Sequence, residues 1–128
     1  MRIIIVLSML LLLPGCSVLN MIPSFSDINQ SHSIVRAQLL IDSINCNEPQ
    51  LAQAIAIERE LRYFELYSQS RGRNEDVIRI ITPIRTTVLD WKKRSQEGVA
   101  SHTYCEMKQK ILIAQTGSAA KAILGRYP

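Results

Sequence analysis

The stretch "NEDVIRIITPIRTTVLDW", residues 74–91, decides the fold class of this chain. Its apolar residues recur at steps of three and four, so on a helix they lie within about 100° of one another, and the charged residues fall elsewhere. The pattern predicts one long helix with a single buried face. The residues on that face are Val77, Ile80, Ile81, Ile84, Val88 and Trp91.

The ends of this stretch also favour a helix. Asn74 stands at the position of an N-cap, and the two acids that follow it suit the positive end of the helix dipole. Pro83 lies away from the apolar face, so we expect a bend there rather than a break. The cations of residues 92–94 suit the negative end, before Gly98. A patch for lipid headgroups or an acidic partner is the alternative interpretation of these cations.

A preceding helix is predicted between Asn47 and Gly72. Asn47 as N-cap, a proline in the first turn and Gln50 three residues after the cap make up a capping box. One apolar face follows, and it contains Leu51, Ala54, Ile57, Leu61, Phe64 and Tyr67.

The same helix carries a second apolar flank, which widens its apolar arc to roughly 200°. One interpretation is a helix that two other helices contact. The other is that part of the arc forms a groove for a partner helix. The candidate partner-binding residues are Tyr63, Tyr67 and Ala56, with Ala52 on the same flank.

Two further helices complete the prediction. Residues 34–45 place Ile34, Ala37, Ile41 and Ile44 on one face. After the long helix, Thr103 and Glu106 form a capping box that opens a last helix, which Gly117 weakens or ends. Residues 118–124 then add a short helical segment. The predicted buried face of the last helix is Tyr104, Met107, Ile111 and Ala114.

The composition agrees with an all-α fold of about four helices. The chain has 128 residues, 47% of them hydrophobic, and only five glycines and five prolines. This length holds one hydrophobic core, and the abundance of good helix formers favours a helix bundle over a β-sandwich. The net charge of +4 is too small to predict nucleic-acid binding.

The first sixteen residues have a pattern of their own. Arg2 and the apolar run that follows it match the start of a secretory signal peptide, and the run is too short to span a bilayer. The run ends in Leu13, Pro14, Gly15 and Cys16, which resembles the lipobox of bacterial lipoproteins. The resemblance implies that residues 1–15 are removed and that Cys16 becomes a lipidated N-terminus. An ordinary signal peptide with an accidental cysteine is the alternative.

The resemblance also implies a location and a layout. Ser17 follows the cysteine where lipoproteins of the inner membrane tend to carry Asp, so we expect a lipid anchor in the outer membrane, on its periplasmic face. Residues 16–33, which include His32, are predicted to form a flexible tether because they are polar and aperiodic. Residues 34–128 are then the helical domain.

Two cysteines remain in the predicted domain. Cys46 and Cys105 would lie in a compartment where disulfides persist, and both stand at helix ends, so a disulfide is predicted between them. A reactive thiol at Cys105 and a zinc site of Cys46, His102 and Cys105 are the alternatives.

Catalytic motifs are missing from the sequence, and neither a cofactor nor a metal is predicted. The carboxylates of residues 58–65 alternate with arginines, and Glu58 and Arg62 have the spacing of a helix-surface ion pair. We therefore expect a binding protein rather than an enzyme.

At the level of layout, the chain is similar to the small helical pilotins of Gram-negative secretion systems. Shared features are the lipobox, a polar tether, a helical body and two body cysteines. The resemblance implies a lipoprotein that grips a segment of a secretin subunit and helps it to reach the outer membrane. A structural or surface-exclusion envelope lipoprotein is one alternative. A periplasmic enzyme inhibitor is another, with residues 69–74 or 96–102 as its protruding loop.

Overall fold

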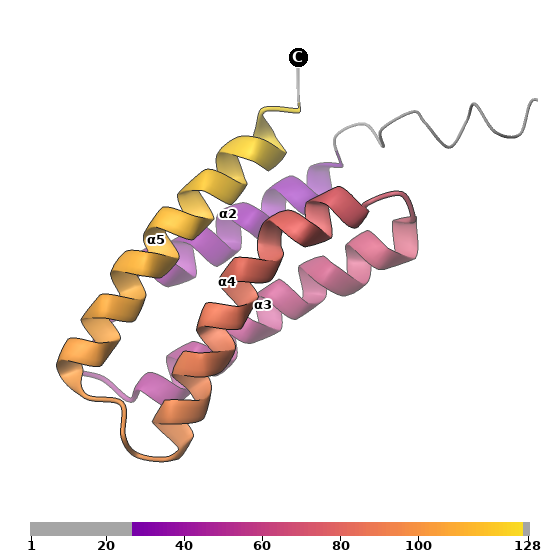
Figure 1. The fold of residues 1–128 in the computed structure, drawn as a ribbon. Coiled ribbons are helices and arrows are strands. Elements are labelled where there is room, and N and C mark those ends of the chain that lie inside the picture. Colours follow the sequence, from indigo (N-terminus) through magenta and orange to yellow (C-terminus); the bar gives the residue numbers. More distant parts are fainter. Residues whose placement is uncertain (1–26, 127–128) are drawn as a thin grey trace, which may run out of the picture.

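A computed structural model describes residues 27–126, which form an antiparallel bundle of four α-helices (Figure 1). The predicted all-α bundle is confirmed. α2 packs against α3 and α5, and α4 packs against the same two neighbours. None of the helices in the described part of the chain is long and apolar enough to cross a membrane. The helices are α2 (Ile28–Asp42), α3 (Gln50–Arg71), α4 (Glu75–Gln96) and α5 (His102–Leu124).

The core forms where the apolar faces of all four helices meet. α4 is the single long helix that its sequence predicts, and it continues through Pro83, which is exposed. Of the residues predicted on its buried face, Ile80 is only partly buried beside the core. Each fully buried large apolar side chain stabilises the fold by about 1.5–3 kcal/mol relative to its exposed state. The largest such side chains are Trp91, Phe64, Ile34, Ile41, Ile57, Leu61, Ile81, Ile84 and Leu112.

α2 begins six residues earlier than the sequence pattern indicates. Asp27 is its N-cap, and the Asp27 carboxylate accepts a hydrogen bond from the Asn29 backbone N–H at 2.9 Å. Polar residues of the first turns are buried: Gln30 Nε2 donates to Ser68 Oγ on α3 at 3.1 Å. The prediction of a tether through residue 33 is therefore wrong for residues 28–33, because their buried faces are polar and hide the helical period. Residues 16–26 lie outside the described part.

Two predicted capping boxes are wrong. Asn47 does not cap α3, which begins at Gln50 after Pro49 without a side-chain cap. The Gln50 side chain is used elsewhere, since its Oε1 accepts a hydrogen bond from Trp91 Nε1 at 2.9 Å. α5 is capped by Ser101, two residues before the predicted Thr103, through Ser101 Oγ and the Tyr104 backbone N–H. Side chains of Ser, Asn and Thr cluster at both boundaries, so local spacing alone does not select the cap.

Asn74 occupies the N-cap position of α4 as predicted, but its side chain makes no capping hydrogen bond there. Instead, Asn74 Nδ2 donates to the backbone carbonyl oxygens of Ser68 and Gly72, at 3.1 and 2.9 Å. The Asn74 side chain therefore closes the short connection between α3 and α4, while its backbone carbonyl accepts a hydrogen bond from the Ile78 N–H at the start of α4.

The buried face of α5 differs from the predicted face by one residue, or 100° of rotation on a helix. Met107 and Ile111 were expected in the core, yet they are 46% and 38% exposed, and Ala114 is exposed as well. The helix also continues through Gly117. The residues that face the core are Cys105, Leu112, Thr116, Ala119, Ala120 and Ile123.

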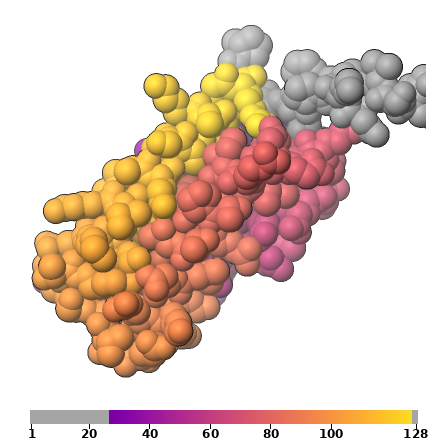
Figure 2. Space-filling view, viewed as in Figure 1, coloured from indigo at the N-terminus to yellow at the C-terminus, as the bar shows by residue number. Residues whose placement is uncertain are grey.

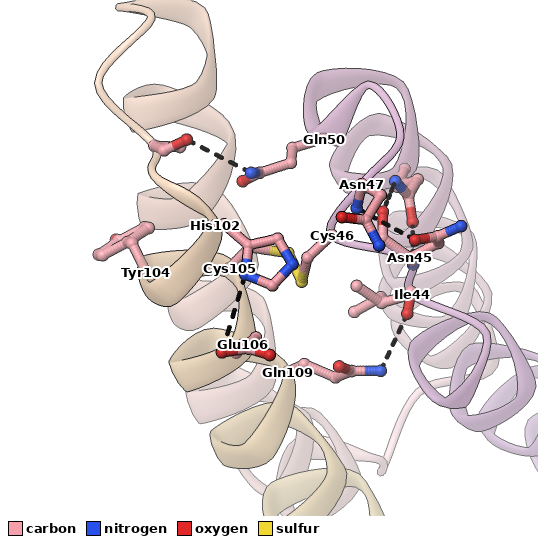
Figure 3. Close-up of a disulfide and its surroundings, with 12 residues drawn as sticks. Ile44, Asn45, Cys46, Asn47, Gln50, His102, Tyr104, Cys105, Glu106 and Gln109 are labelled. Atoms are coloured by element: carbon pink, nitrogen blue, oxygen red, sulfur yellow. Dashed lines mark hydrogen bonds and ion pairs between the residues drawn. A yellow bond between two sulfur atoms is a disulfide. The ribbon is translucent and has the colours of Figure 1, made fainter.

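A disulfide between Cys46 and Cys105 fixes this rotation, and the predicted pairing is confirmed (Figure 3). It joins the segment after α2 to the first turn of α5, with a Cα–Cα distance of 5.7 Å. Gln109 Nε2, one turn further along α5, donates to the Ile44 carbonyl oxygen at 3.0 Å. Because both sulfur atoms are bonded to each other, the reactive-thiol and zinc alternatives are wrong for this state of the protein.

Candidate functional site

The predicted partner-binding residues lie on α3, on the side that faces α2. Ala56 is exposed, Tyr63 is 53% exposed and Tyr67 is half-buried. The structure brings the two tyrosines together, with their ring centroids 6.2 Å apart and their planes nearly parallel. The two rings nevertheless have different surroundings.

Tyr67 is engaged within the bundle. Its hydroxyl donates to Asp27 Oδ2 at 2.7 Å and accepts from Asn29 Nδ2 at 2.9 Å. Arg71 Nε lies 3.3 Å from the same Asp27 oxygen. Burial raises the pKa of Asp27, but the hydrogen bonds from Tyr67 and Asn29 and the charge of Arg71 outweigh it, so this pKa lies below its ordinary value. Tyr67 thus holds the start of α2 against α3.

Tyr63 remains open to solvent, and it separates two surface hollows. The first hollow, of about 790 Å³, lies over the outer side of α2 and reaches Leu124 at the end of α5. The second, of about 410 Å³, lies over the outer side of α3 beside Leu66. Tyr63 lines both hollows. Arg36 lines the first, whereas Arg59 and Arg62 line the second.

The outer side of α2 carries apolar residues that are exposed. Ile28, Val35 and Leu39 are 65%, 39% and 62% exposed. Ile28, His32, Val35 and Leu39 are separated by four, three and four positions. This is the spacing of a helix seam that receives a second helix. Sequence reasoning missed this seam because it assigned residues before Ile34 to a tether. The spacing itself was the available signal.

We use the name α2–α3 face for this surface. Its apolar part comprises Ile28, Val35, Leu39, Ala56, Tyr63 and Leu66, and its cationic part comprises Arg36, Arg59, Arg62 and Arg71.

A second apolar strip lies on the opposite side, which Figure 2 shows as the side formed by α4 and α5. Met107 and Ile111 continue there toward a shallow hollow between the two helices, lined by Ile80, Pro83 and Ala122 among others. This is the strip that the sequence assigned to the core.

An ionic cluster flanks the α4–α5 side. Asp90 Oδ2 accepts a hydrogen bond from the Tyr104 hydroxyl and pairs with Lys108 Nζ, both at 2.6 Å. The hydrogen bonds from Lys108 and Tyr104 hold the pKa of Asp90 below its ordinary value. The Arg94 guanidinium lies 4.9 Å from the centre of the Tyr104 ring. These contacts join α4 to α5 and account for part of the cationic cluster at the end of α4.

The charged residues of α3 pair differently from the sequence prediction. Glu58 pairs with Lys92 on α4 at 2.6 Å, and Arg62 pairs with Glu65 at 2.9 Å. The predicted pair of Glu58 and Arg62 is therefore wrong, because Glu58 pairs with a lysine of α4 and Arg62 pairs with a different glutamate of its own helix. Within residues 27–126, no group of three or more His, Cys, Asp or Glu side chains has the arrangement of a metal site.

No protein-family model matches the sequence, and no curated protein or solved structure is significantly similar to it. The predicted lipidation residue, Cys16, lies outside the described residues, so its modification stays a prediction.

Proposed function

We propose that this chain is an exported bacterial lipoprotein, anchored in the outer membrane through Cys16, that binds another envelope protein and helps to assemble it. In this respect it would act like a pilotin. The lipobox-like sequence at residues 13–16 supports the anchor. The observation that carries the binding role is the position of Tyr63, exposed between two hollows on the α2–α3 face.

The chemistry of this role is helix-in-groove recognition. An amphipathic segment of the partner would place its apolar side chains against Tyr63 and against the seam of Ile28, Val35 and Leu39. Burial of apolar area would offset the entropy lost when the segment orders. A bundle whose helix ends are joined by a disulfide and by the Tyr67 to Asp27 hydrogen bond presents this surface with little reorganisation.

Site-specific photo-crosslinking in intact cells tests the proposal. A crosslinking amino acid is placed at position 63, and in a matched variant at position 111, which is an exposed apolar position on α5. We expect position 63 to capture an outer-membrane assembly subunit such as a secretin, identified by mass spectrometry, and position 111 to capture much less of it. Capture of the subunit from position 111 alone would contradict the assigned face.

The identity of the captured protein separates the proposed role from its alternatives. A ring-forming secretin supports a pilotin-like role. Components of a conjugation apparatus would instead indicate a surface-exclusion lipoprotein, and a soluble periplasmic enzyme would indicate an inhibitor. If neither position crosslinks to any of these three kinds of protein, a binding role on these faces is contradicted.

A further inference from the structure

The ion pairs of the α2–α3 face share an orientation that bears on the partner's charge. In each of three pairs the carboxylate side chain is much less exposed than the guanidinium, which faces solvent. The side chains of Arg36, Arg62 and Arg71 are 71%, 50% and 64% exposed, whereas those of their partners Glu60, Glu65 and Asp27 are 10%, 12% and 14% exposed. A molecule that approaches this face therefore meets guanidinium groups first.

Two ion pairs between α4 and α5, or beside them, have the reverse orientation. Lys108 is 14% exposed and its partner Asp90 is 47% exposed. Arg126 is 25% exposed and its partner Asp76 is 54% exposed. Arg85 on α4 also pairs with Glu65, at 2.8 Å, but its side chain is only 32% exposed. The arginine-out arrangement, with a strongly exposed arginine, is thus most pronounced on the α2–α3 face and does not hold for every ion pair of the bundle.

The arginines lie beside the apolar hollows that the proposed function assigns to a partner. Arg36 lines the hollow over α2, and Arg59 and Arg62 line the hollow over α3, with Tyr63 between them. Arg36 and Arg62 each keep guanidinium N–H groups beyond the one that contacts the buried carboxylate. Those remaining donors suit the carboxylates of a bound segment, because guanidinium and carboxylate groups match in geometry.

From this arrangement we propose that the α2–α3 face selects an amphipathic helix whose apolar strip is flanked by Glu or Asp. The apolar strip packs against Tyr63 and the α2 seam, and the flanking carboxylates contact Arg36, Arg59 and Arg62. Glu60, which is buried, and Glu65, which is partly buried, hold Arg36 and Arg62 in place before binding, so fewer rotamers are lost when the helix docks. This inference rests on the proposed function and adds the charge of the partner.

The test uses the full lipidated protein in neutral detergent and three fluorescent peptides of equal length. All three carry the same apolar strip at steps of three and four, flanked by Glu, Gln or Lys. By fluorescence anisotropy at low salt, we expect the Glu peptide to bind roughly tenfold more tightly than the Gln peptide, with the Lys peptide weakest. The preference should shrink as salt rises toward 0.5 M, because exposed charges are screened.

A pair of charge-reversal variants locates the effect. Arg59→Glu removes an exposed arginine of the α2–α3 face, and Arg79→Glu makes the same change in net charge beside the α4–α5 hollow. We expect Arg59→Glu to weaken binding of the Glu peptide at least threefold and to strengthen binding of the Lys peptide, while Arg79→Glu leaves both within twofold. Arg36 is left unchanged because its removal would strand the buried Glu60 carboxylate.

The outcomes separate the two proposals. Equal, salt-independent binding of all three peptides would overturn the acidic partner and leave the groove intact. No binding of any peptide would contradict the proposed groove itself. If Arg59→Glu leaves peptide binding unchanged but lowers binding to nanodiscs that contain phosphatidylglycerol, the arginines serve an anionic membrane surface and the acidic-helix proposal is overturned.

Discussion

The hydroxyl of Tyr67, near the end of α3, donates a 2.7 Å hydrogen bond to the carboxylate of Asp27, which caps α2. The two residues are 40 positions apart in the sequence. This contact fixes the end of the bundle where the described chain begins and where α5 ends (Figure 1). It also positions the α2 seam beside Tyr63.

Removing this hydroxyl should loosen the start of α2. Tyr67→Phe keeps the ring but leaves Asp27 and Asn29 without their shared partner, so we expect a loss of about 1 kcal/mol in the free energy of unfolding. Amide hydrogen exchange should rise most in residues 28–33. The matched control is Tyr63→Phe, at an exposed ring, which should change stability by less than about 0.5 kcal/mol. Equal effects of the two variants would contradict the role of Tyr67.

Acid should weaken the same contact. The pKa of Asp27 is lowered in the folded protein, so its stabilising contribution is complete above the unfolded value of about 3.9 and is lost as pH falls through the folded value. Asp27→Asn should therefore be less stable than the parent at pH 7, and the difference should shrink below about pH 4. Urea unfolding between pH 7 and pH 2 measures it. Asp42→Asn, at an exposed position at the other end of α2, makes the same change in charge and serves as the control.

The disulfide should contribute a large part of the stability. A bond between residues 59 positions apart restricts the unfolded chain, and the chain-entropy model gives a stabilisation of roughly 4 kcal/mol. The double variant Cys46→Ser with Cys105→Ser should unfold at a correspondingly lower urea concentration. Adding reductant should move the parent protein toward the variant. If complete reduction leaves the urea midpoint of the parent protein unchanged, the disulfide does not contribute this stabilisation.

Substitutions at two neighbouring residues of α5 test which face of this helix is buried. Leu112 is fully buried and Ile111 is 38% exposed. Leu112→Ala should cost about 2–5 kcal/mol, whereas Ile111→Ala should cost less than about 1 kcal/mol. The chain's single tryptophan, Trp91, is buried, so its fluorescence reports unfolding in both variants. The reverse order of costs would favour the face predicted from the sequence over the face in the structure.

The sequence predicts the fold well where one apolar face dominates. α4 has such a face: five of the six residues predicted on it are buried, Ile80 is partly buried, and the helix continues through Pro83. α5 has two apolar strips one residue apart, and periodicity does not choose between Leu112 and Ile111. The disulfide at Cys105 and the packing against α2 and α4 make that choice. Those are tertiary contacts, which a single helix pattern does not contain.

The sequence indicates only the α3 half of the candidate site, the α2–α3 face, because the α2 half depends on tertiary contacts. The broad apolar arc of α3 indicates a surface near Tyr63 and Ala56, and the structure places both at exposed positions. The α2 half of the surface was missed because polar residues such as Gln30 are buried through hydrogen bonds to α3. The arginine-out orientation depends on which member of each ion pair is buried, and the sequence does not encode this locally.

The most direct test of the whole account is the intact mass of the mature protein purified from bacterial membranes. The account predicts a polypeptide that starts at Cys16 and carries a diacylglycerol on its sulfur atom and an acyl chain on its amino group. A polypeptide that retains residues 1–15, or one that starts at an unmodified residue, would contradict the lipid anchor and the outer-membrane role built on it.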